Sequence, residues 1–176
     1  MSAQNKKLTL REMTLFAMLG ALMFVSKILM EALPNIHLLG VLTMTYTIVF
    51  RKKALIPIYI YVFLNGIYAG FAMWWIPYLY VWTVLWAGTM LLPPEIPSRT
   101  KMVLYPVVCC LHGLLYGVLY APAQAFLMGL SPKSTIAWIV AGLPWDAIHG
   151  AGNLVVGFLI LPLSEVLRKL KTIANI

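Results

Sequence analysis

Residues 102–130 read MVLYPVVCCLHGLLYGVLYAPAQAFLMGL and contain no Asp, Glu, Lys or Arg. A membrane-spanning helix needs about 20 predominantly apolar residues, so this stretch alone is long enough to cross a bilayer. The whole chain has the same character, because 62% of its residues are hydrophobic and 10% are charged, with a mean hydropathy of +0.89. Soluble domains are about 45–50% apolar and about 25% charged. The sequence therefore predicts an integral membrane protein.

The apolar runs also predict the class of fold. Only helices and closed barrels satisfy every backbone hydrogen bond within a bilayer. Barrel strands would show about ten residues of alternating polarity, whereas these runs are long and nearly unbroken. We expect one compact domain, residues 1–176, built as an all-α bundle of six transmembrane helices. The expected spans are 8–33, 37–50, 54–72, 77–92, 102–130 and 134–170, of which the second is short enough to be tilted or partly inserted.

The basic residues predict the orientation. They fall in four clusters: Lys6, Lys7 and Arg11; Arg51, Lys52 and Lys53; Arg99 and Lys101; Arg168, Lys169 and Lys171. Six spans place all four clusters on one side, and Lys and Arg gather in cytoplasmic loops, so both termini should be cytoplasmic. The clusters account for the net charge of +8 and suit contact with anionic lipid. They are not arrayed on a nucleic-acid reading module, so no nucleic acid is expected as a partner.

Few ionisable residues fall within the expected spans, which makes them informative. Asp146, His149 and Asn153 follow one another at i, i+3 and i+7 and share one helix face. Two interpretations stay open for this face: a hydrogen-bonded strut between helices, or the polar wall of a ligand site. Lys27 and Glu31, four residues apart, form a candidate intrahelical pair at the outer end of the first span.

Aromatic residues are unusually dense in the third and fourth spans, beyond what an interfacial belt requires. A cavity with aromatic walls and a few polar groups is the usual form of a small-molecule site. It would suit a flat or large conjugated ligand. The candidate site residues from this pattern are Tyr68, Trp74, Trp75, Tyr78 and Trp82, completed by Tyr116, Tyr120 and Trp145 and by the polar pair Asp146 and His149.

The residues that catalysis or a metal would need are scarce. Cys109 and Cys110 are adjacent, point in different directions on a helix and lack metal-ligand spacing, so no metal site is expected. No phosphate-binding glycine loop is present, so the chain is not expected to hydrolyse a nucleotide itself. Two alternatives remain: a small membrane enzyme that uses Asp146 and His149 as an acid–base pair, and a stand-alone homodimeric channel or exporter.

Ala17 and Ala21 lie four residues apart on the first expected helix and form a small-xxx-small pattern. Small residues at this spacing let another membrane helix approach closely. The neighbouring helix can belong to the same bundle or to a partner protein, and the sequence favours neither.

Together these features resemble a known family. The resemblance rests on six spans in under 200 residues, aromatic-rich outer loops, the Ala-x-x-x-Ala pattern and the last-helix segment GLPWDAIHGAGN at residues 142–153. The chain looks like the substrate-binding S-component of an energy-coupling factor (ECF) vitamin transporter. Residues 34–40, Trp74-Trp75 and residues 78–82 look most like the cobalamin-specific S-components.

The resemblance implies a function. Such a subunit sits in the bacterial cell membrane, captures a vitamin from outside, and delivers it by associating with a transmembrane coupling protein and two cytoplasmic ATPases. Ala17 and Ala21 would contact the coupling protein. The ligand would lie near the outer face beside the loop that carries Asn35 and His37. Cobalamin would be a transported ligand and not a permanently bound cofactor.

Other vitamins remain open as ligands. Thiamin would favour an acidic partner, such as Glu31 or Asp146. Folate or pantothenate would favour a cation, such as Lys27 or Lys133. A queuosine precursor is a further alternative within the same family.

Overall fold

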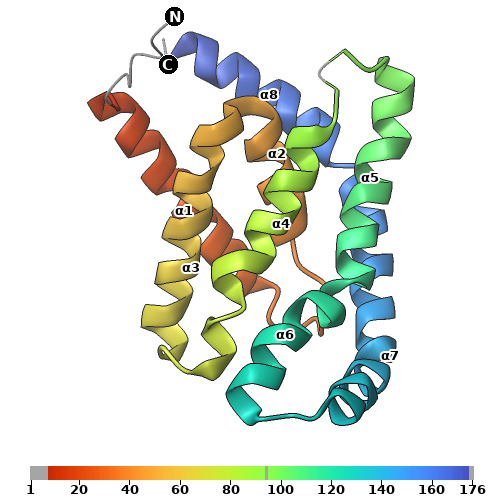
Figure 1. The fold of residues 1–176 in the computed structure, drawn as a ribbon. Coiled ribbons are helices and arrows are strands. Elements are labelled where there is room, and N and C mark those ends of the chain that lie inside the picture. Colours follow the sequence, from red (N-terminus) through yellow and green to blue (C-terminus); the bar gives the residue numbers. More distant parts are fainter. Residues whose placement is uncertain (1–7, 94, 175–176) are drawn as a thin grey trace, which may run out of the picture.

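The computed structural model describes residues 8–93 and 95–174, and the regular secondary structure within these ranges is entirely helical (Figure 1). Lys6 and Lys7, part of the first basic cluster, lie outside the described residues. In chain order the elements are α1 (Leu10–Leu29), α2 (Leu39–Phe50), η1 (Arg51–Ala54), α3 (Leu55–Ala69), η2 (Met73–Trp75), α4 (Tyr78–Leu91), α5 (Ser98–Leu114), α6 (Tyr116–Met128), α7 (Pro132–Gly157) and α8 (Ile160–Ile173).

Each of the six expected ranges contains a helix or a pair of helices. Helices α1 to α4 correspond to the first four ranges, and α5 with α6 fills the fifth, interrupted only at Leu115. The main packing pairs are α5 with α7, α1 with α3, and α2 with α4 and α8. The helical class predicted from the sequence is therefore confirmed for the described residues.

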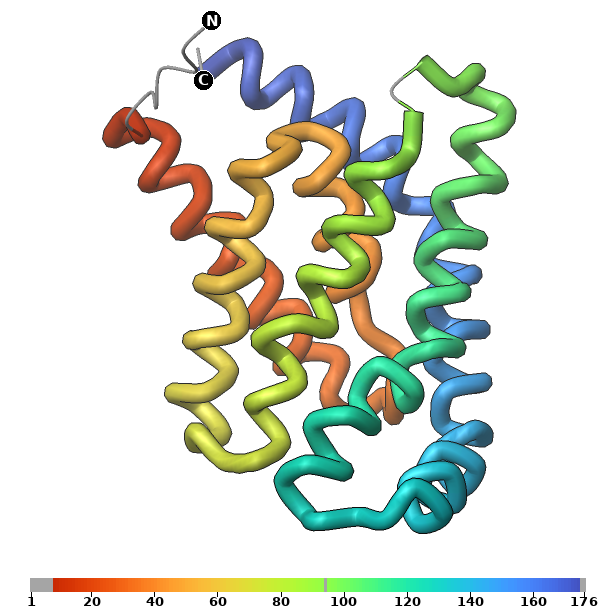
Figure 2. Tube along the Cα trace, viewed as in Figure 1, coloured from red at the N-terminus to blue at the C-terminus, as the bar shows by residue number. Residues whose placement is uncertain are grey.

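The sixth range was wrong as a single helix, because the chain bends by 52° between α7 and α8. After the bend, α8 crosses one end of the bundle (Figure 2). Pro162 lacks the N–H that a continuous helix would bond to the carbonyl of Phe158. Helix α8 is also amphipathic, since Ile160, Ser164 and Leu167 are buried on one side. A helix with one apolar face and a basic opposite face suits a membrane surface better than its interior.

Helix α2 forms the centre of the bundle. Of its twelve residues only Ile48 is not buried. It packs against α1, α4, α5, α7 and α8, and a helix that is hydrophobic all round is expected to be surrounded on all sides. Helix α2 is therefore the core helix of the fold.

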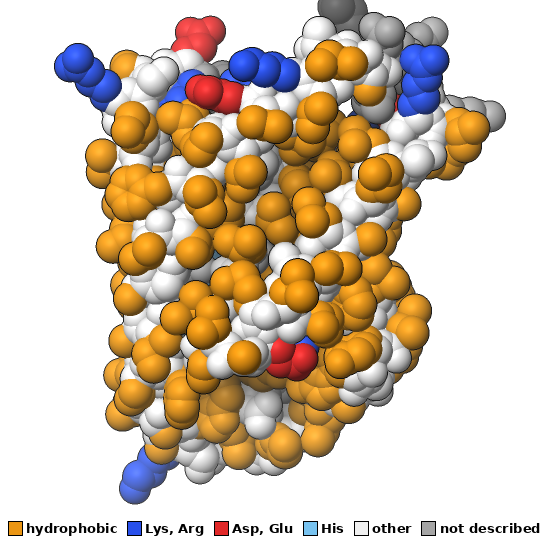
Figure 3. Space-filling view, turned by 180° about the vertical axis from the view of Figure 1, so that it is seen from behind, with side chains coloured by type: hydrophobic (Ala, Val, Ile, Leu, Met, Phe, Trp, Pro, Cys, Tyr) orange, Lys and Arg blue, Asp and Glu red, His pale blue; other side chains and the backbone are white. Residues whose placement is uncertain are grey.

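The distribution of polarity is inverted relative to a soluble protein. Buried polar side chains include Thr43, Thr47, Asn65 and Asn153, whereas Phe126 is 86% exposed. Hydrophobic side chains cover the flank of the molecule in Figure 3. Among the described residues, α1 and the α5–α6 pair are long and apolar enough to cross a membrane, and the bent α7–α8 pair adds a third candidate. These features indicate a membrane protein.

The two ends of the bundle differ in charge. Lys and Arg side chains gather at the end where α1 begins, α2 meets α3, α5 begins and α8 lies (Figures 1 and 3). We call this the basic end. Arg11 donates to the carbonyl of Ala174 at 3.4 Å, and Lys53 pairs with Glu12 across the same end. We call the opposite end, formed by residues 30–38, η2 and α6, the aromatic end.

Candidate ligand-binding site

A pocket of about 190 Å³ lies at the aromatic end. The connection between α1 and α2 forms one wall, and α4, α6 and α7 supply the others. Five of the residues predicted from the sequence line it together: Asn35, His37, Tyr78, Tyr116 and His149. The structure therefore brings side chains from four separate segments into one concave surface.

The connection between α1 and α2 is shaped by a local backbone feature. Asn35 has a φ of 57°, in the left-handed region that asparagine tolerates better than most residues. The Asn35 side-chain amide also donates to the carbonyl oxygen of Trp145 at 3.5 Å, which ties the connection to α7. Two residues later, His37 lines the pocket beside His149.

Trp82 lies at the centre of an aromatic cluster beside this pocket. Its side chain is 1% exposed. Its ring centroid lies between 5.8 and 6.2 Å from the rings of five neighbours, which are His37, Tyr61, Tyr78, His112 and Tyr116. Most of these contacts are edge-to-face or tilted, the arrangements that aromatic quadrupoles favour. Three members of this cluster, His37, Tyr78 and Tyr116, also line the pocket.

Buried ring nitrogens in this region lack hydrogen-bond partners. The His37 and His149 rings lie 4.8 Å apart in an edge-to-face contact, and Tyr116 lies 5.0 Å from His149. Within the described residues, His37 Nδ1, His149 Nε2 and Trp82 Nε1 have no partner. An unpaired buried polar group is costly, and most such groups find a partner. His37 and His149 line the pocket, so their nitrogens are available to bind the polar edge of a ligand, whereas Trp82 is not among the lining residues.

The mouth of the pocket carries one charge of each sign. Lys27 Nζ lies 2.8 Å from Glu31 Oε1, as the spacing of four residues predicted. Lys27 also lies 5.7 Å from the ring centroid of Tyr68. Because the two charges neutralise each other, the site carries no net charge that would select a strongly ionic ligand.

Asp146 does not line the pocket. Both of its carboxylate oxygens accept from the backbone N–H of Gly117 at 3.1 Å, in the first turn of α6. The break at Leu115 creates a new helix N-terminus there, where a negative charge is favourable. A Cβ at Gly117 would lie 2.4 Å from Asp146 Oδ2, so the close approach requires glycine. Asp146 is thus a strut between α6 and α7.

The other two members of the predicted polar face have different surroundings. The Asn153 amide donates to the carbonyl oxygen of Cys109 at 3.1 Å, which joins α7 to α5. His149 is 3% exposed and faces His37 and Tyr116. The two interpretations of this face therefore apply to different residues, since Asp146 and Asn153 are struts and His149 belongs to the pocket wall.

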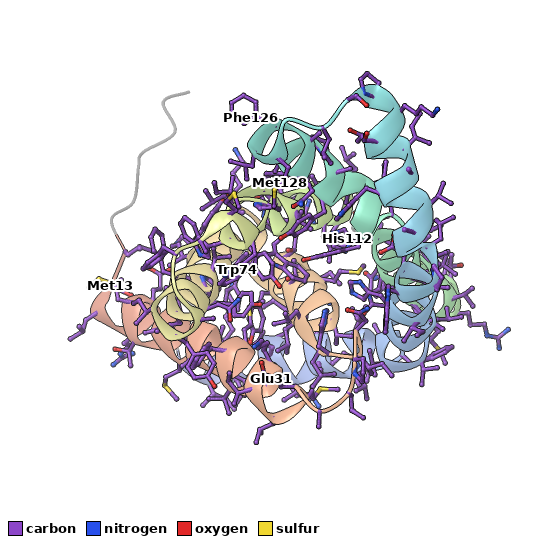
Figure 4. All side chains as sticks on the ribbon, turned by 90° about the horizontal axis from the view of Figure 1, so that it is seen from below. Met13, Glu31, Trp74, His112, Phe126 and Met128 are labelled. Atoms are coloured by element: carbon purple, nitrogen blue, oxygen red, sulfur yellow. The ribbon has the colours of Figure 1, made fainter. Side chains whose placement is uncertain are left out.

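Several predicted aromatic residues lie outside the pocket. Trp75 donates from Nε1 to the carbonyl of Val62 at 2.8 Å and so anchors η2 on α3. Tyr68 and Trp145 have exposed side chains, at 59% and 55%. Tyr120 donates to the carbonyl of Trp74 at 2.9 Å, and the Trp74 ring lies 5.5 Å from Tyr78, so this pair borders the cluster. Figure 4 shows Trp74 and His112 toward the middle of the bundle, with Phe126 at its edge.

His112 belongs to the cluster although the aromatic pattern did not include it. Its Nε2 donates to the carbonyl oxygen of Val81 at 3.1 Å, which leaves Nδ1 without a partner among the described residues. His112 precedes Tyr116 by four residues, and their rings lie 6.1 Å apart. That spacing places both on one helix face and was the available signal.

The described residues show no metal-binding arrangement of three or more His, Cys, Asp or Glu side chains. Cys109 is a free, buried thiol and Cys110 is a free, half-buried one.

The small residues of α1 face two directions. Gly20 packs against α3, where an added Cβ would lie 2.5 Å from a methyl group of Ile60. Ala17 and Ala21 are exposed on another face. Packing within the described bundle therefore uses Gly20, and the Ala-x-x-x-Ala face remains accessible.

No protein-family model, curated protein or solved structure matches this chain. These comparisons therefore assign the chain to no family. The functional assignment depends on the pocket, the two ends and the accessible face of α1.

Proposed function

We propose that this chain is the substrate-capture subunit of an ECF-type vitamin importer, which binds its vitamin in the pocket at the aromatic end. The observation that carries the proposal is the set of unpaired ring nitrogens around an aromatic-walled pocket, in an all-helical chain with apolar flanks. Pockets that combine apolar walls with a few convergent polar groups are the usual form of small-molecule sites.

The chemistry of the wall describes the ligand. Tyr78 and Tyr116 offer aromatic faces, and His37 and His149 offer nitrogens that can donate or accept a hydrogen bond. The paired charges of Lys27 and Glu31 add no net charge. A conjugated ligand that is neutral overall and carries polar edges fits this surface.

Cobalamin is the ligand that the sequence resemblance favours. The size of the pocket decides whether cobalamin can enter without a movement of the protein. The volume of about 190 Å³ is below the roughly 300–1,000 Å³ of pockets that enclose drug-sized ligands. A corrinoid therefore requires the 30–38 connection to move outward. A smaller ligand requires less movement, such as thiamin, which has two separate heteroaromatic rings, or a queuosine precursor, which has one fused ring system.

The two ends support an orientation and a set of partners. Six spans with the basic end in the cytoplasm would obey the positive-inside rule and place the pocket outside. The accessible Ala17 and Ala21 face suits close packing with a helix of a transmembrane coupling protein. Two ATPases in the same complex would supply the energy, in a bacterial plasma membrane. The proposal assigns no catalysis to this chain.

Calorimetric titration of the purified chain in detergent tests the proposal, first with cobalamin and then with thiamin, riboflavin, folate, pantothenate and a queuosine precursor. We expect nanomolar binding of one of them. Tyr78→Ala should weaken it about tenfold or more, because the variant removes a pocket wall. Phe126→Ala is the matched control and should leave affinity unchanged, since Phe126 is 86% exposed at the aromatic end and does not line the pocket. Ala21→Trp should keep the affinity but prevent co-purification with the coupling protein.

The outcomes separate the parts of the proposal. Binding of another vitamin with silent cobalamin would retain vitamin capture and overturn the assignment to cobalamin. A folded chain that binds none of them would overturn capture and favour the membrane enzyme or the stand-alone exporter. Transport by the chain expressed alone would favour the exporter.

A further inference from the structure

A second concave surface lies at the basic end, in the elbow between α7 and α8. It has a volume of about 290 Å³ and is bounded by the first half of α5. Gly157, the last residue of α7, lies directly against α5, since an added Cβ would lie 2.7 Å from Pro106 Cα. The helices therefore touch at Gly157 and diverge after the 52° bend, which leaves a groove open at the surface.

One half of this groove is apolar. Phe158, Leu161 and Pro162 line it from the α7–α8 side, and Met102 and Pro106 line it from α5. Phe158 and Met102 are 57% and 53% exposed. This half is continuous with the apolar flank of α5, which is part of a candidate membrane span.

The other half is polar and carries a net positive charge. Lys101, Tyr105 and Glu165 line it. Arg168 follows Glu165 by three residues on α8, so the two side chains lie on the same face of that helix. Two cations, Lys101 on α5 and Arg168 on α8, therefore accompany one carboxylate, Glu165. Anionic groups are favoured at such a place, and lipid-facing Lys and Arg side chains extend toward phosphate-bearing head groups.

We propose that the α7–α8 elbow binds a phospholipid with a net negative head group, such as phosphatidylglycerol. Lys101 and Arg168 hold the phosphate, and one acyl chain lies along Phe158 and Leu161. The groove sits where the charged end meets the apolar flank, which is the depth at which a head group joins its acyl chains. This site is separate from the vitamin pocket, which lies at the other end of the bundle.

Native mass spectrometry of the detergent-purified chain tests this assignment, with phosphatidylglycerol and phosphatidylcholine of identical acyl chains as probes. We expect retention of one phosphatidylglycerol at concentrations where phosphatidylcholine is lost. Lys101→Gln combined with Arg168→Gln should weaken phosphatidylglycerol binding at least tenfold, since each basic residue near an anionic lipid contributes about fivefold. Lys52→Gln combined with Lys133→Gln removes the same charge away from the groove and should change it less than twofold.

Glu165→Gln acts in the opposite direction and should strengthen phosphatidylglycerol binding, because it removes the one carboxylate of the groove. This gain keeps the test decisive if the double variant folds poorly. Equal retention of the two lipids, or equal loss in the control pair, would overturn the site. Displacement of the lipid by millimolar glycerol phosphate would show a soluble-phosphate site and overturn the lipid assignment.

Discussion

The aromatic end and the basic end differ in how completely their polar groups are paired. At the basic end, the Thr9 hydroxyl and the Glu12 carboxylate form a reciprocal capping box, and Glu12 also pairs with Lys53. Arg51 donates to the carbonyl oxygen of Met90 at 3.0 Å. At the aromatic end, ring nitrogens of His37 and His149 are buried without partners among the described residues.

This difference separates structural from functional polarity. Polar groups that satisfy one another stabilise the fold and leave nothing for a ligand to gain. Polar groups that stay unpaired in a buried site cost stability, and a ligand that pairs with them recovers that cost. Variants of the unpaired groups should therefore lower ligand affinity, whereas variants of the paired groups should lower only stability.

The largest effect is expected at Trp82, which serves both purposes. Trp82→Ala removes a side chain that is 1% exposed and contacts five other rings. It should lower the free energy of unfolding by about 3–5 kcal/mol, the usual cost of truncating a buried tryptophan. Ligand binding should be lost as well. Thermal unfolding in detergent and calorimetry measure the two quantities.

Trp145→Ala is the matched control, because the Trp145 side chain is 55% exposed and the substitution keeps the backbone carbonyl that accepts from Asn35. It should change stability by less than about 1 kcal/mol. Equal effects of the two tryptophan variants would contradict the central role given to Trp82.

A smaller effect is expected at Asp146, which lies near the pocket but is assigned to the fold. Asp146→Ala removes the acceptor for the Gly117 N–H at the start of α6 and should cost about 1–2 kcal/mol of stability, as loss of a helix cap does. Asp146→Asn keeps an acceptor and should recover most of that loss. Both variants should bind ligand within about twofold of the unaltered chain. Lost affinity with unchanged stability would instead place the Asp146 carboxylate on the ligand.

The sequence was informative where the signal was a long apolar run. The fifth range was found because residues 102–130 contain no charged residue, a signal that does not depend on how the helices pack. The bend before α8 was missed, although only the first two-thirds of the sixth range is apolar and Pro162 follows soon after that part. The break at Leu115 has only a weak local signal, the glycines at positions 113 and 117, within an apolar run that continues through it.

The candidate site was predictable by residue type but not by direction. Tyr78 and Trp75 looked equivalent as aromatic residues of one segment, yet Tyr78 lines the pocket and Trp75 anchors η2 on α3. The rotation of each helix decides which face turns inward, and that rotation depends on packing across the whole bundle. The role of Asp146 as a strut could not be recognised from the sequence, because it depends on the helix N-terminus that the break at Leu115 creates.

The smallest effect is expected at Glu12, and it tests whether the two ends are independent. The Glu12 carboxylate accepts from the Thr9 backbone N–H at 3.0 Å and pairs with Lys53, which joins the start of α1 to η1. Glu12→Gln should lower stability by about 0.5–1 kcal/mol, because the ion pair is partly exposed and solvent screens it. Glu95→Gln, at an exposed position between α4 and α5, is the matched control and should have no effect on unfolding. Ligand affinity should be unchanged in both variants. If Glu12→Gln weakened ligand binding as well, the ends would be coupled through α1, which carries Glu12 near its start and Lys27 at the mouth of the pocket, and polar groups at the basic end would then have a functional role too.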